Sequence, residues 1–270
     1  MSEGFDIKNR LKSYFPVFFE LLGENDLDWK TINKVFTKKT SQYVKKYESI
    51  KQNIRVEASL FNIITASIQG NPSAISLLDF IQKLFEELIR RLDRSERKLI
   101  ANTLFGSLTN MDRKYLNFLG ELCVLNNVKR NTSLKLTGVE VPVIHNKPNG
   151  PKIDFKFLNA TKSTHLMVEI VNIQLNEMES WSDEQVNNLL NQKIQGKLNR
   201  TGIRENSNFQ LIPVLWGSIE ELNRVNTFYK TNGISFRNTS IPVCFMSFTN
   251  SDGGKVHMFG TIDSIMGFAS

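Results

Sequence analysis

The sequence predicts an α/β protein in which a helical N-terminal region, residues 1–110, precedes a mixed β-sheet core flanked by helices, residues 111–270. Two observations lead to this prediction. Up to about residue 130, apolar residues recur at three- and four-residue spacing, which is the period of an amphipathic helix. Beyond that point, short apolar segments alternate or run together as strands do, and helical segments lie between them.

The helical region contains several segments with this spacing. Residues 5–22 hold the first, and Pro16 within it is expected to kink or break the helix. Residues 29–55 form one apolar stripe, while the other faces carry eight Lys or Arg residues against a single acid. A further helix is expected to end before Pro72, and residues 74–108 hold one long helix or two.

The core region is expected to begin with strands. Residues 131–144 and 152–158 alternate polar and apolar side chains, and residues 165–175 form a nearly continuous apolar run, typical of a strand buried on both faces. Ser182 and Gln185 form a capping box that predicts the start of the next helix. The remaining elements are expected in the order strand, helix, strand, strand, at residues 209–217, 218–230, 241–249 and 256–262.

Charge and cysteine content indicate the environment of the protein. The 270 residues include 34 Lys or Arg against 27 Asp or Glu, a net charge of +7 that suits a polyanionic partner. The two cysteines, Cys123 and Cys244, are too few for a disulfide framework or a cysteine-based zinc site, which favours a reducing compartment. No apolar run approaches the ~20 residues of a membrane helix, and the N-terminus lacks a signal-peptide core. We therefore expect a cytoplasmic protein without a membrane span.

Several motif-based enzyme classes have no support in the sequence. The three histidines, His145, His165 and His257, do not have the spacing of metal ligands. The GxSxG elbow of hydrolases and the GxGxxG fingerprint of dinucleotide-binding proteins are both absent. Residues 252–255, "DGGK", match a hairpin turn better than a phosphate-binding loop.

Two carboxylates in the predicted strands suggest a site. Glu169 lies within the apolar run "LMVEIVNI", where a buried carboxylate is costly unless it is paired, hydrogen-bonded or bound to a metal. Asp154 has the matching place on the preceding strand, and the short polar connection makes the two strands antiparallel neighbours. The carboxylates could then meet on one face near the end of the sheet, as the hard-oxygen site that Mg²⁺ or Mn²⁺ prefers.

From residue 112 to about 217, the order of elements resembles that of the PD-(D/E)xK, or restriction-endonuclease-like, nucleases. The segment "PKIDF" is similar to the first half of the family motif and "VEIVN" to the second. The resemblance implies a restriction-endonuclease-like core in which Asp154, Glu169 and a helix acid, Glu121, hold Mg²⁺ or Mn²⁺. It also implies a metal-dependent endonuclease that cleaves phosphodiester bonds, of DNA more than of RNA, in restriction or anti-phage defence.

The chain departs from the family at the motif lysine, because position 171 is valine. Three alternatives follow. The lysine has moved to the next helix, where Lys193 is preferred over Lys197. Lys156, on the strand face of Asp154, takes its place. Or the site is inactive, and the restriction-like fold serves to bind nucleic acid or to scaffold a partner.

Basic residues supply candidate contacts to nucleic acid phosphates. Lys197 and Arg200 lie in the last turn of the helix after the second motif strand, where they also complement the helix dipole. Lys38 and Lys45 belong to the basic segment 29–55, which either contacts the nucleic acid backbone or is simply solvated. The helical region could instead assemble with a second copy or a protein partner.

The candidate acids also have purely structural interpretations. Asp154 could be an exposed edge-strand residue paired with Lys156, and Glu169 could form an ion pair with Lys193 in the absence of a metal. Glu121 could be an ordinary helix-surface residue.

Overall fold

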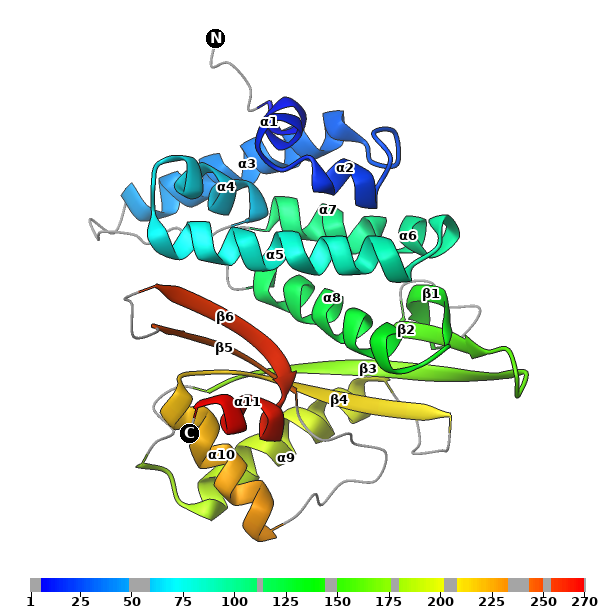
Figure 1. Cartoon of the computed structure of the whole chain (residues 1–270), viewed down its shortest axis with the longest axis vertical. Coiled ribbons are helices and arrows are strands. Elements are labelled where there is room, and N and C mark those ends of the chain that lie inside the picture. Colours follow the sequence, from blue (N-terminus) through cyan, green and yellow to red (C-terminus); the bar gives the residue numbers. More distant parts are fainter. Residues whose placement is uncertain are drawn as a thin grey trace. The chain divides into compact units, whose positions relative to one another are not determined.

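Helices and a β-sheet follow one another along the chain, with the sheet in the C-terminal half (Figure 1). The computed structural model describes residues 6–48, 59–110, 114–143, 150–175, 180–201, 208–232, 243–249 and 254–269. These residues form eleven helices and one six-stranded mixed sheet, which confirms the mixed α/β class and the helical N-terminal region. The chain divides into two compact units, Met1–Asn126 and Asn127–Ser270. The division therefore lies inside a helix, whereas the sequence placed it between residues 110 and 111.

The first unit is built from helices. They are α1 (Ile7–Tyr14), α2 (Val17–Leu21), α3 (Trp29–Glu48), α4 (Leu60–Ile68), α5 (Pro72–Arg91), α6 (Arg94–Leu99), α7 (Ala101–Thr109) and most of α8 (Lys114–Asn131). The predicted break at Pro16 is confirmed, because it separates α1 from α2. Residues 74–108, expected as one helix or two, contain parts of three. Asp93 and Glu96 form a capping box that starts α6, just after α5 ends at Arg91.

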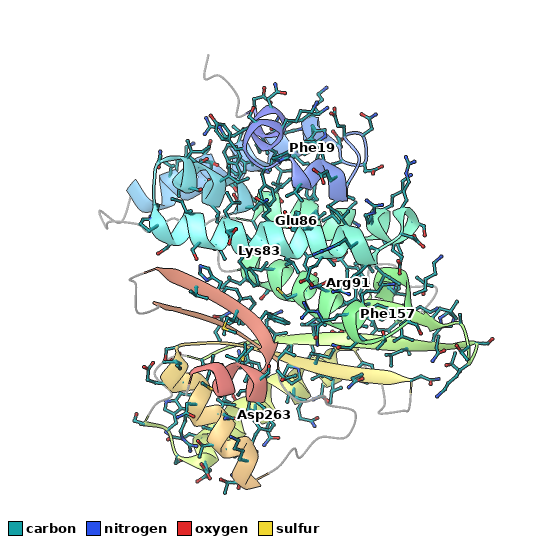
Figure 2. All side chains as sticks on the ribbon, viewed as in Figure 1. Phe19, Lys83, Glu86, Arg91, Phe157 and Asp263 are labelled. Atoms are coloured by element: carbon teal, nitrogen blue, oxygen red, sulfur yellow. The ribbon has the colours of Figure 1, made fainter. Side chains whose placement is uncertain are left out.

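The apolar side of α3 anchors this helix in the first unit. Ile32 and Phe36 are buried, and the Phe36 ring meets the Phe61 ring edge-on at a centroid distance of 5.0 Å. At the start of the helix, the Trp29 ring lies 5.5 Å from the ring of Phe19, which Figure 2 labels. Because one side of the helix is held in this way, the opposite side is turned away from the core.

The sheet of the second unit is mixed because helices connect its central strands. Its strands are β1 (Lys135–Pro142), β2 (Lys152–Asn159), β3 (Thr164–Gln174), β4 (Phe209–Trp216), β5 (Val243–Thr249) and β6 (Lys255–Thr261), and they lie side by side in this order. The helices α9 (Asp183–Thr201) and α10 (Ile219–Asn232) join β3 to β4 and β4 to β5, and both of these pairs are parallel. The pairs β1–β2, β2–β3 and β5–β6 are antiparallel.

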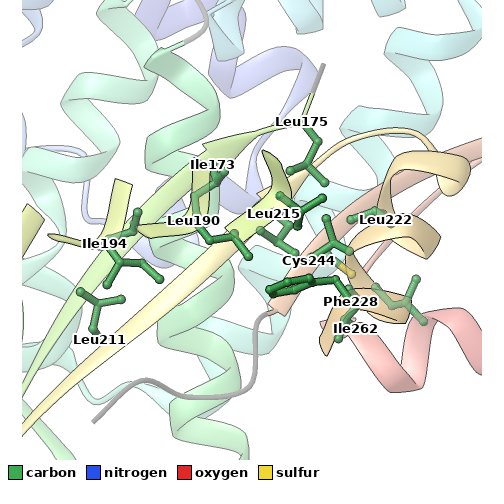
Figure 3. Close-up of a cluster of buried hydrophobic side chains, with 14 of the residues drawn as sticks. Ile173, Leu175, Leu190, Ile194, Leu211, Leu215, Leu222, Phe228, Cys244 and Ile262 are labelled. Atoms are coloured by element: carbon green, nitrogen blue, oxygen red, sulfur yellow. The ribbon is translucent and has the colours of Figure 1, made fainter. Parts of the chain in front are cut away.

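One face of this sheet and its helices form the core of the second unit. The predicted capping box is confirmed, because Ser182 and Gln185 exchange hydrogen bonds at the start of α9. The strands contribute residues such as Ile173 and Leu215, and α9 contributes Leu190 (Figure 3). A short helix, α11 (Ile262–Ala269), follows β6 and packs into the same cluster. The sequence analysis did not predict α11, although Thr261 at its start and Asp263 in its first turn are helix-start signals.

Two helical glycines allow the packing of the first unit to be tested. A Cβ atom on Gly106 of α7 would lie 2.4 Å from the Phe118 ring of α8, whereas a Cβ on Gly196 of α9 would meet no atom within 4 Å. We predict that Gly106→Ala lowers the free energy of unfolding by about 1–3 kcal/mol through overpacking. Gly196→Ala should raise it by up to about 1 kcal/mol, since alanine is the better helix former. Urea unfolding measures both, and equal effects would contradict the close α7–α8 packing.

Candidate active site

The site lies where β3 changes its hydrogen-bonding partner. The backbone ladder between β2 and β3 extends only from Asn159 paired with Thr164 to Phe155 paired with Val168. From Met167 onward, β3 pairs on its other side with β4 as far as Gln174. Beyond the end of the β2–β3 ladder, the two strands are connected through the side chains of Asp154 and Glu169. We call this place between the strands the fork.

Asp154 and Glu169 occupy this fork. Asp154 precedes Phe155 on β2 and Glu169 follows Val168 on β3, so the antiparallel register, if continued by one pair, places them opposite each other. The backbone N–H of Asp154 donates to Glu169 Oε2 at 3.1 Å, and the N–H of Ile170 donates to Asp154 Oδ2 at 2.7 Å. Each carboxylate thus accepts a hydrogen bond from a backbone N–H of the facing strand. The structure brings the two acids together on one face, as the sequence indicated, although they lie in the middle of β3 and not at its end.

Lys197 of α9 completes the group. Its Nζ atom lies 2.7 Å from Glu169 Oε1 and 3.7 Å from Asp154 Oδ2. The Glu169 side chain is only 1% exposed, whereas Asp154 and Lys197 are 20% and 26% exposed. Within the described part of the chain, Glu169 Oε1 has no hydrogen-bond partner of good geometry. The 2.7 Å contact is nevertheless short enough for a strong ion pair, so we treat Lys197 as its partner.

The position of Lys197 along α9 lets it reach the carboxylates. Val186, Leu190 and Ile194 are spaced four residues apart and are all buried in the core. Lys197 follows Ile194 by three residues and so belongs to the same helix face. Lys193 lies one turn before Lys197, about 40° away around the helix, and it is exposed. The sequence analysis preferred Lys193, whereas the structure pairs Lys197 with both acids.

The surroundings of Glu169 are apolar. Its neighbour in register on β4 is Leu211, and the residue two positions on, Val171, is 5% exposed within the core cluster. Val171 is the position at which the motif would have a lysine. The positive charge beside Glu169 therefore comes from Lys197 of α9 and not from β3.

Burial controls the protonation of the two acids. Burial and then the charge of Asp154 raise the pKa of Glu169 to about 7, although Lys197 and the Asp154 N–H act in the opposite direction. The pKa of Asp154 also lies above its ordinary value, again mainly because of burial. Near neutral pH, Glu169 thus lies close to the midpoint of its titration.

The other predicted site residues belong to β2, α3, α8 and the end of α9. Lys156 is half-buried on β2, and no ion pair connects it to either acid among the residues that the structure describes. Glu121 is half-buried on α8 and belongs to the first unit, whereas the fork belongs to the second. Lys38 and Lys45 are exposed on α3. The backbone of Arg200 is helical, but its side chain lies outside the described part of the structure.

Glu140 is a nearby acid that the sequence analysis did not single out. The register of β1 and β2 places it across from Asp154, and its negative charge helps to raise the pKa of Asp154. Its φ angle of 49° is unusual for a non-glycine residue in a strand. The Glu140 side chain is 52% exposed and pairs with Lys152 at 3.7 Å. The only sequence signal for Glu140 was the alternation of apolar and polar residues in "GVEVP".

The described residues contain no group of three or more His, Cys, Asp or Glu side chains that could hold a metal.

Comparison with known proteins identifies no relative of this chain: no family model, no curated protein and no solved structure matches it. None of the described helices is both long enough and apolar enough to cross a membrane.

The buried ion pair gives a prediction with a matched control. Lys197→Met keeps the aliphatic stem but removes the charge beside Glu169, so at about pH 8 the free energy of unfolding should fall by about 1–3 kcal/mol. At about pH 5 the loss should be smaller, because Glu169, with a pKa of about 7, is then protonated in both proteins. Lys193→Met, at an exposed position one turn earlier in the same helix, should change stability by less than about 0.5 kcal/mol.

Urea unfolding at the two pH values measures both variants. A Lys197→Met effect that is independent of pH, or equal to that of Lys193→Met, would contradict the assigned pairing.

Proposed function

We propose that this protein is a metal-dependent nuclease with a restriction-endonuclease-like core, which hydrolyses phosphodiester bonds of nucleic acid, DNA more than RNA. One observation carries the proposal: Asp154, Glu169 and Lys197 converge at the fork between β2 and β3. Two acids and a lysine on one face of a mixed sheet are the residue types that the PD-(D/E)xK resemblance implies. The lysine comes from α9 rather than from the strand position of Val171.

The residues at the fork fit a small divalent cation. Asp154 and Glu169 present carboxylate oxygens from facing positions, which is the ligand type that Mg²⁺ and Mn²⁺ prefer. Mg²⁺ commonly uses one or two carboxylates and keeps several waters, so two acids suffice. A bound cation would supply activation of water and stabilisation of the charge on a cleaved phosphate.

The protein's own groups have separate tasks in this proposal. The N–H groups of Asp154 and Ile170 fix the orientation of both carboxylates, because each donates to one of them. This arrangement holds the acids in place before any ligand arrives. Lys197 is a positive group with three donors beside them, and it can orient an attacking water or stabilise developing negative charge. The apolar surroundings strengthen each of these interactions.

A second candidate function rests on the same observation. The Lys197 ammonium already satisfies Glu169, and Val171 occupies the motif lysine position. Such an ion pair can be purely structural. In that case the chain is a catalytically inactive restriction-like module that binds nucleic acid or scaffolds a partner.

A cleavage assay on supercoiled DNA, linear DNA and RNA, with Mg²⁺, Mn²⁺ or EDTA, tests the proposal. We predict cleavage with a metal and none with EDTA. Glu169→Gln and Lys197→Met should each lower the rate by at least about 100-fold, because each removes a group held at the reacting phosphate. Lys193→Met, the control, should change it by less than about twofold, because Lys193 is exposed and outside the fork.

Cleavage that survives Glu169→Gln would overturn the assignment of the fork as the active site. Binding of nucleic acid without cleavage under any metal condition would favour the inactive module.

A further inference from the structure

We propose that a row of exposed lysines on α3 binds the phosphate backbone of nucleic acid. The α3 row consists of Lys30, Lys34, Lys38 and Lys45. It belongs to the first unit, whereas the fork belongs to the second. The inference concerns binding and does not require the fork to be catalytic.

The geometry of α3 places these four residues on one side. The first three are spaced four residues apart, and Lys45 follows Lys38 by seven, so all lie within about 80° around the helix axis. All four are exposed, and Ser41, which completes the row, is exposed as well. The buried residues Ile32 and Phe36 lie on the opposite side of the helix. The row extends over about 22 Å, the axial length of about six base pairs of duplex.

The charge of the row has little compensation among the described side chains, where Asp28 at the start of α3 is the acid that interacts with Lys30. No lysine of the α3 row lies within ion-pair distance of a carboxylate among the residues for which the structure gives side chains. Glu48 is the only acid of this 20-residue helix. Like charges four residues apart destabilise a helix, and a lysine in the first turn opposes the helix dipole. These costs are offset when an anion binds along the row.

Helix α5 shows the ordinary arrangement in the same unit. It also has 20 residues, but its surface bases have acids one turn away: Lys83 pairs with Asp79 at 2.7 Å, and Arg91 with Glu87 at 3.5 Å. Figure 2 labels Lys83, Glu86 and Arg91 along this helix. The difference between α5 and α3 is therefore a difference in charge pattern, not in length or exposure.

The side chains around the row favour nucleic acid over a membrane surface. A helix that binds a membrane inserts an apolar face, and the apolar face of α3 is buried in the protein. The neighbours of the row are polar, including Thr31, Ser41 and Gln42. Val44 is an isolated exposed apolar side chain on this helix. Lysines with hydroxyl and amide neighbours are the groups that contact phosphate and sugar.

Two variants with the same change in net charge test the inference. The first is Lys30→Gln with Lys34→Gln and Lys38→Gln, which neutralises most of the row. The control is Lys8→Gln with Lys12→Gln and Lys83→Gln, three lysines of the same unit that pair with Glu24 or Asp79. Both are made in a Glu169→Gln background with EDTA, so that no cleavage occurs. Fluorescence anisotropy with a DNA duplex of about 20 base pairs gives the affinity as a function of salt concentration.

We expect the row variant to bind the duplex at least tenfold more weakly at about 0.1 M salt. The slope of log K against log salt should become shallower by about two to three, since about one counterion is released per phosphate contact. The control should keep the slope of the parent protein. Circular dichroism checks that helix content is retained; if the triple variant does not fold, Lys34→Gln alone should reduce the slope by about one.

Equal affinity and equal slope in the two triple variants would overturn the inference. Binding to phosphatidylserine vesicles but not to the duplex would overturn it as well. The outcome is separate from that of the nuclease proposal. A protein that binds DNA through α3 and cuts nothing refutes only catalysis at the fork, whereas a protein that cuts DNA but binds equally well without the row refutes only this inference.

Discussion

Burial of the Glu169 carboxylate is the constraint on which the arrangement of the second unit depends. The side chain is 1% exposed among apolar neighbours, and an unpaired charge there would cost several kcal/mol. Three groups offset this cost: the N–H of Asp154, the ammonium of Lys197 and, in part, a proton, since the pKa is about 7. The N–H belongs to β2 and the ammonium to α9, so the carboxylate of β3 connects these three elements at one point.

The topology of the sheet creates the place for this carboxylate. β3 is antiparallel to β2 over its first residues and parallel to β4 over the rest. Where the first ladder ends, backbone N–H groups of both strands are left for side-chain acceptors, and Asp154 and Glu169 supply them. The parallel pairing requires a crossover helix, and that helix, α9, covers the same face and delivers Lys197. The fork and the lysine are thus two consequences of one change in strand direction.

Much of this arrangement could be predicted from the sequence because it depends on local patterns. The alternation around Asp154 and the apolar run around Glu169 predict two strands, and a short connection makes them antiparallel neighbours, which the structure confirms. The lysine was expected one turn too early, because Lys193 and Lys197 lie on the same helix face and only the position of α9 along the sheet decides which of them reaches the carboxylates.

Other features depend on tertiary structure, which local patterns do not specify. Glu140 is near Asp154 only through the register of β1, and the short helix α11 begins directly where β6 ends. The division of the chain inside α8 depends on how that helix packs.

The central claim is that the fork exchanges its proton for a divalent cation, and Mn²⁺ binding measured by electron paramagnetic resonance tests it most directly. The account predicts that the protein binds Mn²⁺ and that this binding tightens from about pH 6 to about pH 8, as Glu169 loses its proton. Glu169→Gln should weaken Mn²⁺ binding at least tenfold, whereas Lys193→Met should leave it unchanged. Absence of Mn²⁺ binding across this range, or equal binding by Glu169→Gln, would contradict it.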